Sequence, residues 1–545
     1  MTINNQLVNP SSIAIIGGSN NIKKPGGKII YNLLQGNFQG NIYVVNPNED
    51  NVQNLGCYQD VKQLPDVELA IICLPAHLCP PVINVLAKEK HCHAFIIISA
   101  GFSETGYKGV LIEKDILETL NQTNSCLLGP NCIGLLNTNY QGVFTEPLPK
   151  LHSKGYDFVS SSGSTAVFIM ESAIPKGITF SSVFSVGNGT QIGIEEVLEY
   201  WDNTFDPETS PAIKLMYIEA IKNPVKLLEH TTSLIDKGCS IAAIKSGITQ
   251  VGGRAAASHT GAMSNPDTAV EALFKKAGII RCHSREELTN TAIILANKPL
   301  KNKRIAIITH AGGPAVMLTD ILTANGFEVP ETNINNVNDL KKKLFPGSSV
   351  QNPIDILATG TAKQLAAAIN FCENQCFDIG GMVVIFGSPG LVQVDDAYQV
   401  IHEKMRSCNK PIYPVLPSTL TAHDEILRFI EKGNAFFTDE VLLGEALINI
   451  ANTKQPRLNT EIIKVELPMS MKVVESLKTG FVPVDEINIV LHEIGIPEIS
   501  STIVKDEISL LTATSNMKYP LVLKAMGFTH KTDVGGVSLN IKSEE

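Results

Sequence analysis

One histidine stands in a run of residues that are too small to cover it. His259 lies in the segment 252–263, which reads GGRAAASHTGAM and holds four alanines, three glycines, one serine and one threonine. An imidazole changes its charge near neutral pH and can serve as a nucleophile. The small neighbours predict a histidine that another molecule can approach, although a histidine in a solvated loop or with a purely structural role has the same appearance.

Two glycine turns that precede predicted helices indicate where an anion would bind. Residues 157–163, DFVSSSG, read as a strand and a turn, followed by a helix over 164–173. Residues 304–314, RIAIITHAGGP, repeat the pattern before a helix predicted from about 315 to 326. Helix N-termini offer free N–H groups and the positive end of the helix dipole. The candidate phosphate-binding residues are therefore Ser162, Gly163, Ser164, Gly312 and Gly313.

The first part of the chain reads as alternating strands and helices. Apolar runs at 12–18, 41–47, 69–75, 94–101 and 126–132 are typical of buried parallel strands. Right-handed crossovers between them give a Rossmann-like sheet, which binds its ligand at the carboxyl ends of the strands. The candidates at those ends are Gly17, Gly18, Ser19, Asn46, Pro47, Leu74, Pro75, Ala100, Gly101, Asn131 and Cys132, any one of which could be only a tight turn.

The glycine turn after the first strand indicates a phosphate-bearing nucleotide ligand but disfavours NAD. It does not spell G-x-G-x-x-G, and the second strand ends in Asn46-Pro47. A dehydrogenase of this fold carries an acidic residue there to bind the ribose. A nicotinamide-dependent dehydrogenase is therefore a weak alternative.

The same α/β pattern recurs twice, so the expected fold is α/β with three consecutive Rossmann-like or flavodoxin-like domains of parallel sheet. We expect domains at 1–150, 151–300 and 301–455, with the linker centred on 451–467. The remaining segment, 456–545, contains one predicted helix and a few short strands. It looks too small to be a complete nucleotide-binding domain.

Composition excludes several functional classes. The chain has 545 residues and a net charge of −10, which argues against nucleic acid as a partner. No apolar run is long enough to span a bilayer, and the N-terminus lacks the features of a signal peptide. The eleven cysteines include no C-x-x-C pair, which fits a cytoplasmic protein. Cys372 and Cys376 could share a helix face, but without nearby histidines we expect no metal site in this chain.

The order of motifs resembles the nucleoside-diphosphate-forming acyl-CoA synthetases, the group of ADP-forming acetate–CoA ligases related to succinyl-CoA synthetase. No single motif would suffice, but nine in the family's order are specific, and they extend over nearly the whole chain. They are SIAIIG (12–17), SAGF (99–102), GPNC (129–132), SSSG (160–163), YIE (217–219), AASHTGA (256–262), GGP (312–314), NPID (352–355) and HKTDVGGV (530–537).

The resemblance implies a reaction and a set of roles. Acyl-CoA, phosphate and ADP would give a carboxylic acid, with acetate as the default, together with CoA and ATP. The family's phosphorylated histidine is His259, its carboxylate partner is Glu219, and His530 is a second phosphoryl carrier. Lys524 resembles the nucleotide-phosphate lysine of ATP-grasp domains, and CoA is expected at the strand ends of the first domain. His310 could compete with His259, but its place before a glycine turn favours a packing role.

The chain departs from the family pattern in its last segment. A complete ATP-grasp domain needs more chain, including carboxylates that bind Mg²⁺, so 456–545 is expected to be the N-terminal part of such a domain. A partner chain would then complete it, and a homo-oligomer is the other expected assembly. The alternative is a non-catalytic CoA-binding or CoA-sensing protein that has lost the ATP-grasp half.

Overall fold

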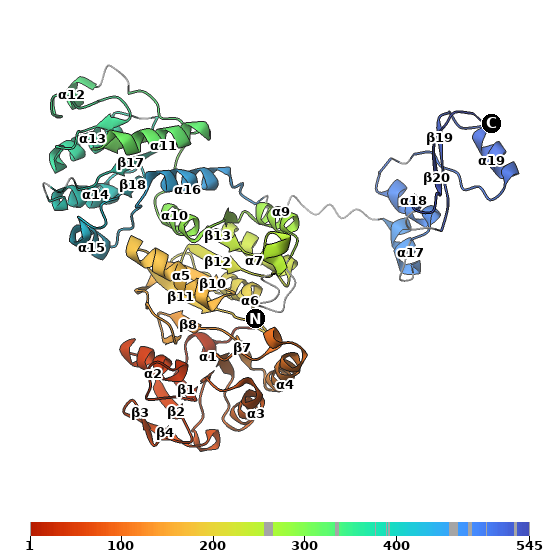
Figure 1. The fold of residues 1–545 in the computed structure, drawn as a ribbon, viewed down its shortest axis with the longest axis horizontal. Helices are drawn as coiled ribbons and strands as arrows, with labels where there is room; N and C mark the ends of the chain where they lie inside the picture. The colour runs from red at the N-terminus through yellow and green to blue at the C-terminus, as the bar shows by residue number, and fades with distance from the viewer. Residues whose placement is uncertain are drawn as a thin grey trace. The chain divides into compact units, whose positions relative to one another are not determined.

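The computed structural model describes residues 2–254, 265–332, 337–376, 378–388, 390, 393–456, 467–477, 482–497, 499–527 and 531–543. The chain forms two compact units, Met1–Leu458 and Asn459–Glu545, which are described separately below (Figure 1). No described helix is both long and apolar enough to cross a membrane.

The first sheet of the larger unit has the strand order β3-β4-β2-β1-β5-β6-β7. All its pairings are parallel except the hairpin β3–β4. Strands β1, β5 and β6 are buried along their whole length, as expected for a parallel sheet with both faces covered. The strands are β1 (Ser12–Ile16), β2 (Asn41–Val45), β3 (Asn51–Val52), β4 (Leu55–Tyr58), β5 (Leu69–Ile72), β6 (Ala94–Ile97) and β7 (Cys126–Leu128), and the α-helices are α1 (Asn5–Val8), α2 (Pro25–Gln35), α3 (Cys79–Glu89) and α4 (Tyr107–Thr123).

Two glycines allow the first helix to approach the end of the first strand. Gly17 follows β1 with φ +89°, and a Cβ there would stand 2.9 Å from the carbonyl oxygen of Cys73. Gly26 lies in the first turn of α2, where a Cβ would stand 2.2 Å from the carbonyl oxygen of Gly17. Any side chain at Gly26 would therefore push the helix away from the turn.

The second sheet has the order β14-β13-β12-β10-β11-β8-β9. Its core is parallel, and β8 pairs antiparallel with both β11 and β9. Its strands are β8 (Gly134–Asn137), β9 (Gln141–Val143), β10 (Leu151–Ser160), β11 (Phe180–Ser185), β12 (Ile213–Ile218), β13 (Ser240–Lys245) and β14 (Ile280–Cys282), and its α-helices are α5 (Gly163–Ala173), α6 (Ile194–Asn203), α7 (Pro224–Asp236), α9 (Asp267–Ala277) and α10 (Arg285–Leu295).

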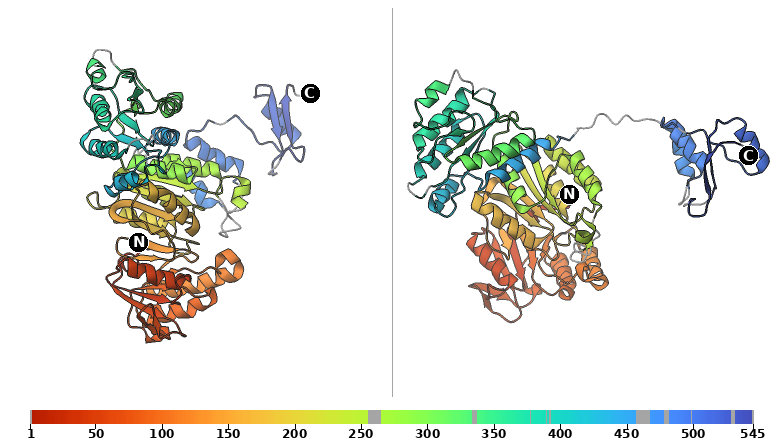
Figure 2. Two further views of the ribbon diagram at one scale, coloured as in Figure 1. Left: turned by 60° about the vertical axis from the view of Figure 1, so that its left-hand side comes forward. Right: turned by 45° about the horizontal axis from the view of Figure 1, so that its top comes forward.

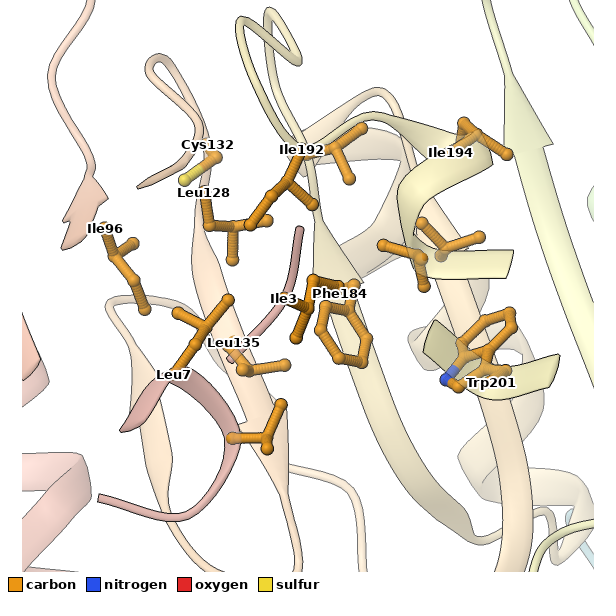
Figure 3. Close-up of a cluster of buried hydrophobic side chains, with 14 of the residues drawn as sticks. Ile3, Leu7, Ile96, Leu128, Cys132, Leu135, Phe184, Ile192, Ile194 and Trp201 are labelled. Carbon is orange, nitrogen blue, oxygen red and sulfur yellow. The ribbon is translucent and has the colours of Figure 1, made fainter. Parts of the chain in front are cut away.

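The hairpin β8–β9 lies before residue 150 in the chain but belongs to the second sheet. Its side chains alternate between two cores, since Leu135 packs in the cluster shared with the first sheet and Leu136 in the cluster on the other side. Figure 3 shows Leu135 with Leu128, Phe184 and Trp201 in the shared cluster. The first two sheets are thus joined by one continuous hydrophobic core.

The third sheet has four parallel strands in the order β16-β15-β17-β18. Its last helix, α16, leaves the sheet to pack between α10 and α11 (Figures 1 and 2). Its strands are β15 (Ile305–Thr309), β16 (Ile354–Asp355), β17 (Gly381–Ile385) and β18 (Ile412–Val415), and its helices are α11 (Gly312–Ala324), α12 (Val337–Lys341), α13 (Ala362–Asn374), α14 (Asp395–Ser407), α15 (His423–Glu431) and α16 (Glu440–Asn452).

Helix α11 begins at Gly312, three residues before the predicted start, so the glycine pair is inside its first turn. Pro314 is tolerated there because the N–H groups of the first turn have no partner within the helix.

The smaller unit, Asn459–Glu545, holds three helices and one antiparallel hairpin among its described residues. Of those residues only Ser470 and Val473 are buried. The elements are α17 (Pro468–Ser476), α18 (Val484–Glu493), α19 (Glu507–Thr514), β19 (Leu521–Lys524) and β20 (Val537–Ile541).

Candidate functional site

A cavity of about 490 Å³ lies where α4 meets the loops of the second sheet. This volume is within the range of small-molecule sites. Two of the regions singled out by sequence, the turn after β10 and the end of β12, border it through Ser161 and Glu219. The described lining is Ser103, Val110, Glu113, Lys114, Leu117, Ser161, Val186, Gly187, Asn188, Gly189, Thr190, Gly193, Ile194, Glu195, Glu219, Ala220 and Lys222.

Glu219 lies directly beside the serine turn because β10 and β12 are parallel neighbours, with Ser160 opposite Tyr217. The backbone N–H of Glu219 donates to Oγ of Ser161 at 3.4 Å. Parallel pairing therefore brings the predicted carboxylate to the predicted anion-binding turn, although 58 residues separate Glu219 from Ser161.

Helix α5 presents its N-terminus close to this cavity. Ser162 caps the helix, and its Oγ accepts a hydrogen bond from the N–H of Thr165 at 3.3 Å. No described residue accepts a hydrogen bond from the N–H groups of Gly163 or Ser164, as expected in the first turn of a helix. These two N–H groups and the helix dipole are suited to an anion.

The predicted nucleophile, His259, lies outside the described residues, with the rest of 255–264. The described residues on either side attach close to Glu219. The backbone N–H of Ser246, after β13, donates to the carbonyl oxygen of Ile218 at 3.0 Å. The amide of Asn265 accepts from the N–H of Ile221 at 2.8 Å and donates to its carbonyl oxygen at 3.1 Å. Ser246, thirteen residues before His259, and Asn265, six residues after it, thus each bond to a residue within two positions of Glu219.

An asparagine that sequence reasoning missed ties the second sheet to the first. The Nδ2 group of Asn188, in the loop after β11, donates to Glu104 at 2.6 Å, to Glu113 at 3.1 Å and to Oγ of Ser103 at 3.2 Å. Burial opposes ionisation of Glu104, but its hydrogen bonds from Asn188 and from the N–H groups of Gly101 and Phe102 lower its pKa overall. An ionised Glu104 thus holds the turn after β6 against the loop after β11 that carries Asn188.

Two further charged residues fix the loop that follows Glu219. Nζ of Lys222 donates to the carbonyl oxygens of Asn188 at 2.8 Å and Gly189 at 2.7 Å. Buried Glu195 accepts from the N–H groups of Lys222 at 2.7 Å and Asn223 at 2.9 Å. These contacts join residues far apart in the chain, and no local motif marks them.

The residues predicted to bind CoA gather at the carboxyl edge of the first sheet. Nδ2 of Asn46 donates to the carbonyl oxygen of Gly18 at 2.8 Å, and the N–H of Asn131 donates to that of Ser99 at 2.9 Å. The thiol of Cys132 faces the core instead, and burial raises its pKa to about 12. None of the predicted CoA-binding residues is in the described lining of the cavity, so their role stays a prediction.

The second glycine turn, Gly312–Gly313, does not border this cavity in its described lining. The ring of His310 packs against Phe386 with a centroid distance of 4.7 Å, and its Nε2 accepts from the N–H of Gly387 at 2.6 Å. Burial lowers the pKa of His310. These contacts agree with the packing role expected for it.

The predicted nucleotide site falls in the smaller unit. Lys524 is the last residue of β19 and is exposed. His530 lies outside the described residues. In the described part of the chain no group of three or more histidines, cysteines, aspartates or glutamates could hold a metal ion.

Comparison with protein families finds three matches along the chain. Residues 11–138 match a CoA binding domain, residues 154–295 a succinyl-CoA ligase like flavodoxin domain, and residues 478–545 an ATP-grasp domain.

Curated proteins with similar sequences include the alpha subunit of acetate–CoA ligase [ADP-forming] II from Pyrococcus furiosus, 34% identical over 64% of this chain and 75% of that subunit. Acetate–CoA ligase [ADP-forming] I from Archaeoglobus fulgidus is 29% identical over 98% of this chain and 77% of that protein. A similar solved structure is the dinucleotide forming acetyl-coenzyme A synthetase 1 of Ca. Korarchaeum cryptofilum in complex with phosphate and ADP. It is 25% identical and has a TM-score of 0.73, over 83% of this chain and 97% of that one.

Proposed function

Because the chain belongs to the family of ADP-forming acetate–CoA ligases, we propose that it converts an acyl-CoA, phosphate and ADP into a carboxylate, CoA and ATP through a phosphorylated His259. Acetate is the proposed acid. The observation that supports the proposal is that Ser246 and Asn265, which flank His259 in the chain, both bond to neighbours of Glu219, which lies beside the turn before α5.

The proposed chemistry divides into three transfers. Phosphate attacks the thioester carbon, and the CoA thiolate leaves with an acyl phosphate remaining. A neutral nitrogen of His259 then attacks phosphorus and releases the carboxylate. Finally an oxygen of the ADP β-phosphate takes the phosphoryl group from the histidine. Each step exchanges one bond for another, so no oxidant or reductant is needed.

The chain's own residues would assist the middle step. Glu219 would accept a hydrogen bond from the second imidazole nitrogen of His259, which fixes the tautomer and stabilises the cationic ring that forms. The N–H groups of Gly163 and Ser164 would receive the phosphoryl oxygens, which carry about two negative charges near neutral pH. Gly312 and Gly313, at the start of α11, are proposed as a second set of donors for the same charge.

CoA and ADP fit different parts of the chain. At the carboxyl edge of the first sheet, Gly17 and Gly26 let the first turn of α2 pack backbone against backbone on the end of β1, and we assign CoA to that edge. CoA supplies the thiol that leaves and returns. ADP is assigned to the segment that contains Lys524 and His530. Mg²⁺ is assigned to carboxylates in the part of the ATP-grasp fold that the proposed partner chain would supply.

A further polypeptide segment is proposed to cover the smaller unit. Its hairpin exposes apolar side chains such as Val522, Leu523 and Leu539, which are 52%, 43% and 69% exposed. Exposed apolar residues gathered in this way mark an interaction surface. We propose a partner chain that completes the ATP-grasp fold, with a homo-oligomer as the alternative assembly.

We also propose a reducing, cytoplasmic setting, because all eleven cysteines are free.

The direct test is phosphorylation from acetyl-CoA and radiolabelled phosphate. The wild-type chain should acquire an acid-labile label, and His259→Ala should acquire none. Glu219→Gln should slow labelling by about 100-fold or more, since a misplaced carboxylate partner costs at least that much in comparable pairs. His310→Ala is the matched control and should label normally.

Label that persists in His259→Ala would refute the assignment. Binding of CoA without labelling by any acyl-CoA would favour the alternative of a CoA-binding protein without turnover. A series of acyl-CoA substrates in the same assay would test the choice of acetate.

A further inference from the structure

Two cysteines lie together at the end of helix α13, and neither is in the described lining of the 490 Å³ cavity. Cys372 lies in the last turn of α13 and is buried, whereas Cys376 follows two residues after the helix and is half-buried. Their thiols are close enough to affect each other's ionisation. Both line a cavity of about 270 Å³, together with Thr332, Asn352 and Asp378. The pair therefore has an opening through which a small molecule can reach it.

A buried lysine supplies positive charge at the same place. Nζ of Lys410 donates to the carbonyl oxygens of Cys372 at 2.8 Å, Glu373 at 2.7 Å and Cys376 at 3.0 Å. Its ammonium closes the carboxyl end of α13 and stands near both thiols. A nearby cation favours the thiolate, which is the reactive form of cysteine.

The pKa of the Cys376 thiol is shifted in the opposite direction from that of every other cysteine in the chain. The neighbouring thiol of Cys372 and the charge of Lys410 lower the pKa of Cys376, despite its partial burial. The other ten cysteines all have a raised pKa. Cys57 is also only half-buried, but burial raises its pKa. Exposure alone therefore does not set Cys376 apart.

We propose that Cys372 and Cys376 form a redox-active dithiol that reacts with a small organic disulfide entering this cavity. The thiolate of Cys376 attacks one sulfur of the disulfide, forms a mixed disulfide and releases one thiolate. The thiol of Cys372 then gives up its proton and attacks Sγ of Cys376, which releases the second thiol. The cysteine pair is oxidised by two electrons and the small disulfide is reduced to two thiols, so the exchange balances.

The spacing of the two residues allows the final bond. Nζ of Lys410 bonds the carbonyl oxygens of both Cys372 and Cys376, so these oxygens lie within about 6 Å of each other, and disulfides bridge Cα atoms about 4.4–6.8 Å apart. The order of attack follows from accessibility, because Cys376 is the half-buried member and Cys372 the buried one. The proposal does not depend on the acyl-CoA reaction.

The test uses the full-length chain and oxidised glutathione, with mass spectrometry of the intact protein and of its peptides. The wild type should lose two thiols, retain no glutathione and yield a peptide with a bond between Cys372 and Cys376. Cys372→Ala cannot complete the second step, so it should retain one glutathione on Cys376. Cys376→Ser should show no reaction at Cys372.

The matched control is Cys57→Ser, which should react as the wild type does. Cys376 should also react about tenfold faster than Cys57 at pH 7, because more of it is thiolate. Equal labelling of Cys57 and Cys376, or the absence of a Cys372–Cys376 peptide from the oxidised wild type, would overturn the proposal. The wild-type peptide map gives this answer even if Cys372→Ala fails to fold.

Discussion

At the scale of single residues, Lys214 and Asp157 place an ion pair inside the second sheet. Their side chains are 1% and 6% exposed, and Nζ of Lys214 also stands 5.3 Å from the ring centroid of Trp201. Oγ of Ser182 donates to the Asp157 carboxylate at 2.6 Å. Burial raises the pKa of Asp157 even though Lys214 opposes this effect. Burying the two charges therefore costs desolvation free energy, and removing only one of them should cost still more stability.

Removing only Lys214 should destabilise the protein strongly. Lys214→Met leaves the Asp157 carboxylate without its ammonium, and we expect the free energy of unfolding to fall by about 3–5 kcal/mol at pH 7. A carboxyl group with a raised pKa in the folded state loses stability as pH rises through that pKa. The deficit relative to the wild type should therefore be smaller at pH 5 than at pH 7 in urea denaturation.

The double variant Lys214→Met/Asp157→Leu is the control for this prediction. With both charges gone, most of the lost stability should return. If the single variant and the double variant are equally unstable, the loss comes from packing around Trp201 rather than from the unpaired carboxylate.

At the scale of elements, the loop between β11 and α6 holds α4 against the second sheet through Asn188. Its amide nitrogen serves three oxygens that belong to the turn after β6 and to α4. Asn188→Ala should leave Glu104 and Glu113 facing each other without a shared donor. Glu113 lines the 490 Å³ cavity, and Glu104 follows the lining residue Ser103. The part of the cavity wall that α4 forms should therefore shift.

We expect Asn188→Ala to raise KM for acyl-CoA, with a loss in kcat/KM of about tenfold, corresponding to one lost hydrogen-bond network worth about 1.4 kcal/mol. Steady-state kinetics with acyl-CoA as the varied substrate measures this. Asn203→Ala, on the exposed end of α6, is the matched control. An unchanged KM in Asn188→Ala would show that this contact only supports the fold.

Sequence patterns predicted the elements whose signal is local. The strand–glycine–helix units around Ser162 and Gly312 are present because an apolar run and a glycine turn determine them within about twenty residues. The predicted boundary at residue 150 puts the hairpin β8–β9 in the first domain, but β8 pairs with β11 of the second sheet, since chain position does not reveal which sheet a short strand joins. Asn188 was missed for a similar reason, because its partners lie 75 to 85 residues away.

The residue-level site could be predicted only in part. Glu219 was chosen by resemblance, and the structure places it beside the Ser161 turn through parallel pairing of β10 with β12. Lys222 and Glu195 shape the same loop, but an isolated lysine or glutamate gives no signal in one sequence. The role of His259 stays a prediction, because the residue lies outside the part that the structure describes.

At the scale of the whole molecule, the two units differ in how much they bury. The larger unit has extensive apolar clusters, whereas the described residues of the smaller unit bury only Ser470 and Val473. Folding needs enough buried apolar surface to offset the loss of conformational entropy. The described residues of the smaller unit therefore do not form the core that an independent domain of that length needs.

A fragment of residues 459–545 should show no cooperative thermal transition by circular dichroism. A fragment of residues 1–458 should unfold in a cooperative manner, because its clusters are complete within it. Adding the partner proposed for the ATP-grasp fold should restore a transition to the short fragment through mass action. A sharp transition of residues 459–545 alone would contradict the proposed need for a covering segment.

The hydrogen bonds between Asn265 and the backbone of Ile221 limit how far His259 can lie from that point. His259 is six residues from Asn265 and five from Arg254, and a fully extended chain spans at most about 3.5 Å per residue. The Cα atom of His259 can therefore lie at most about 20 Å from that of Asn265. If His259 carries the phosphoryl group as proposed, the next acceptor, His530 or ADP, must come within reach of that limit, so chain length and not affinity sets the largest distance between the two reaction centres.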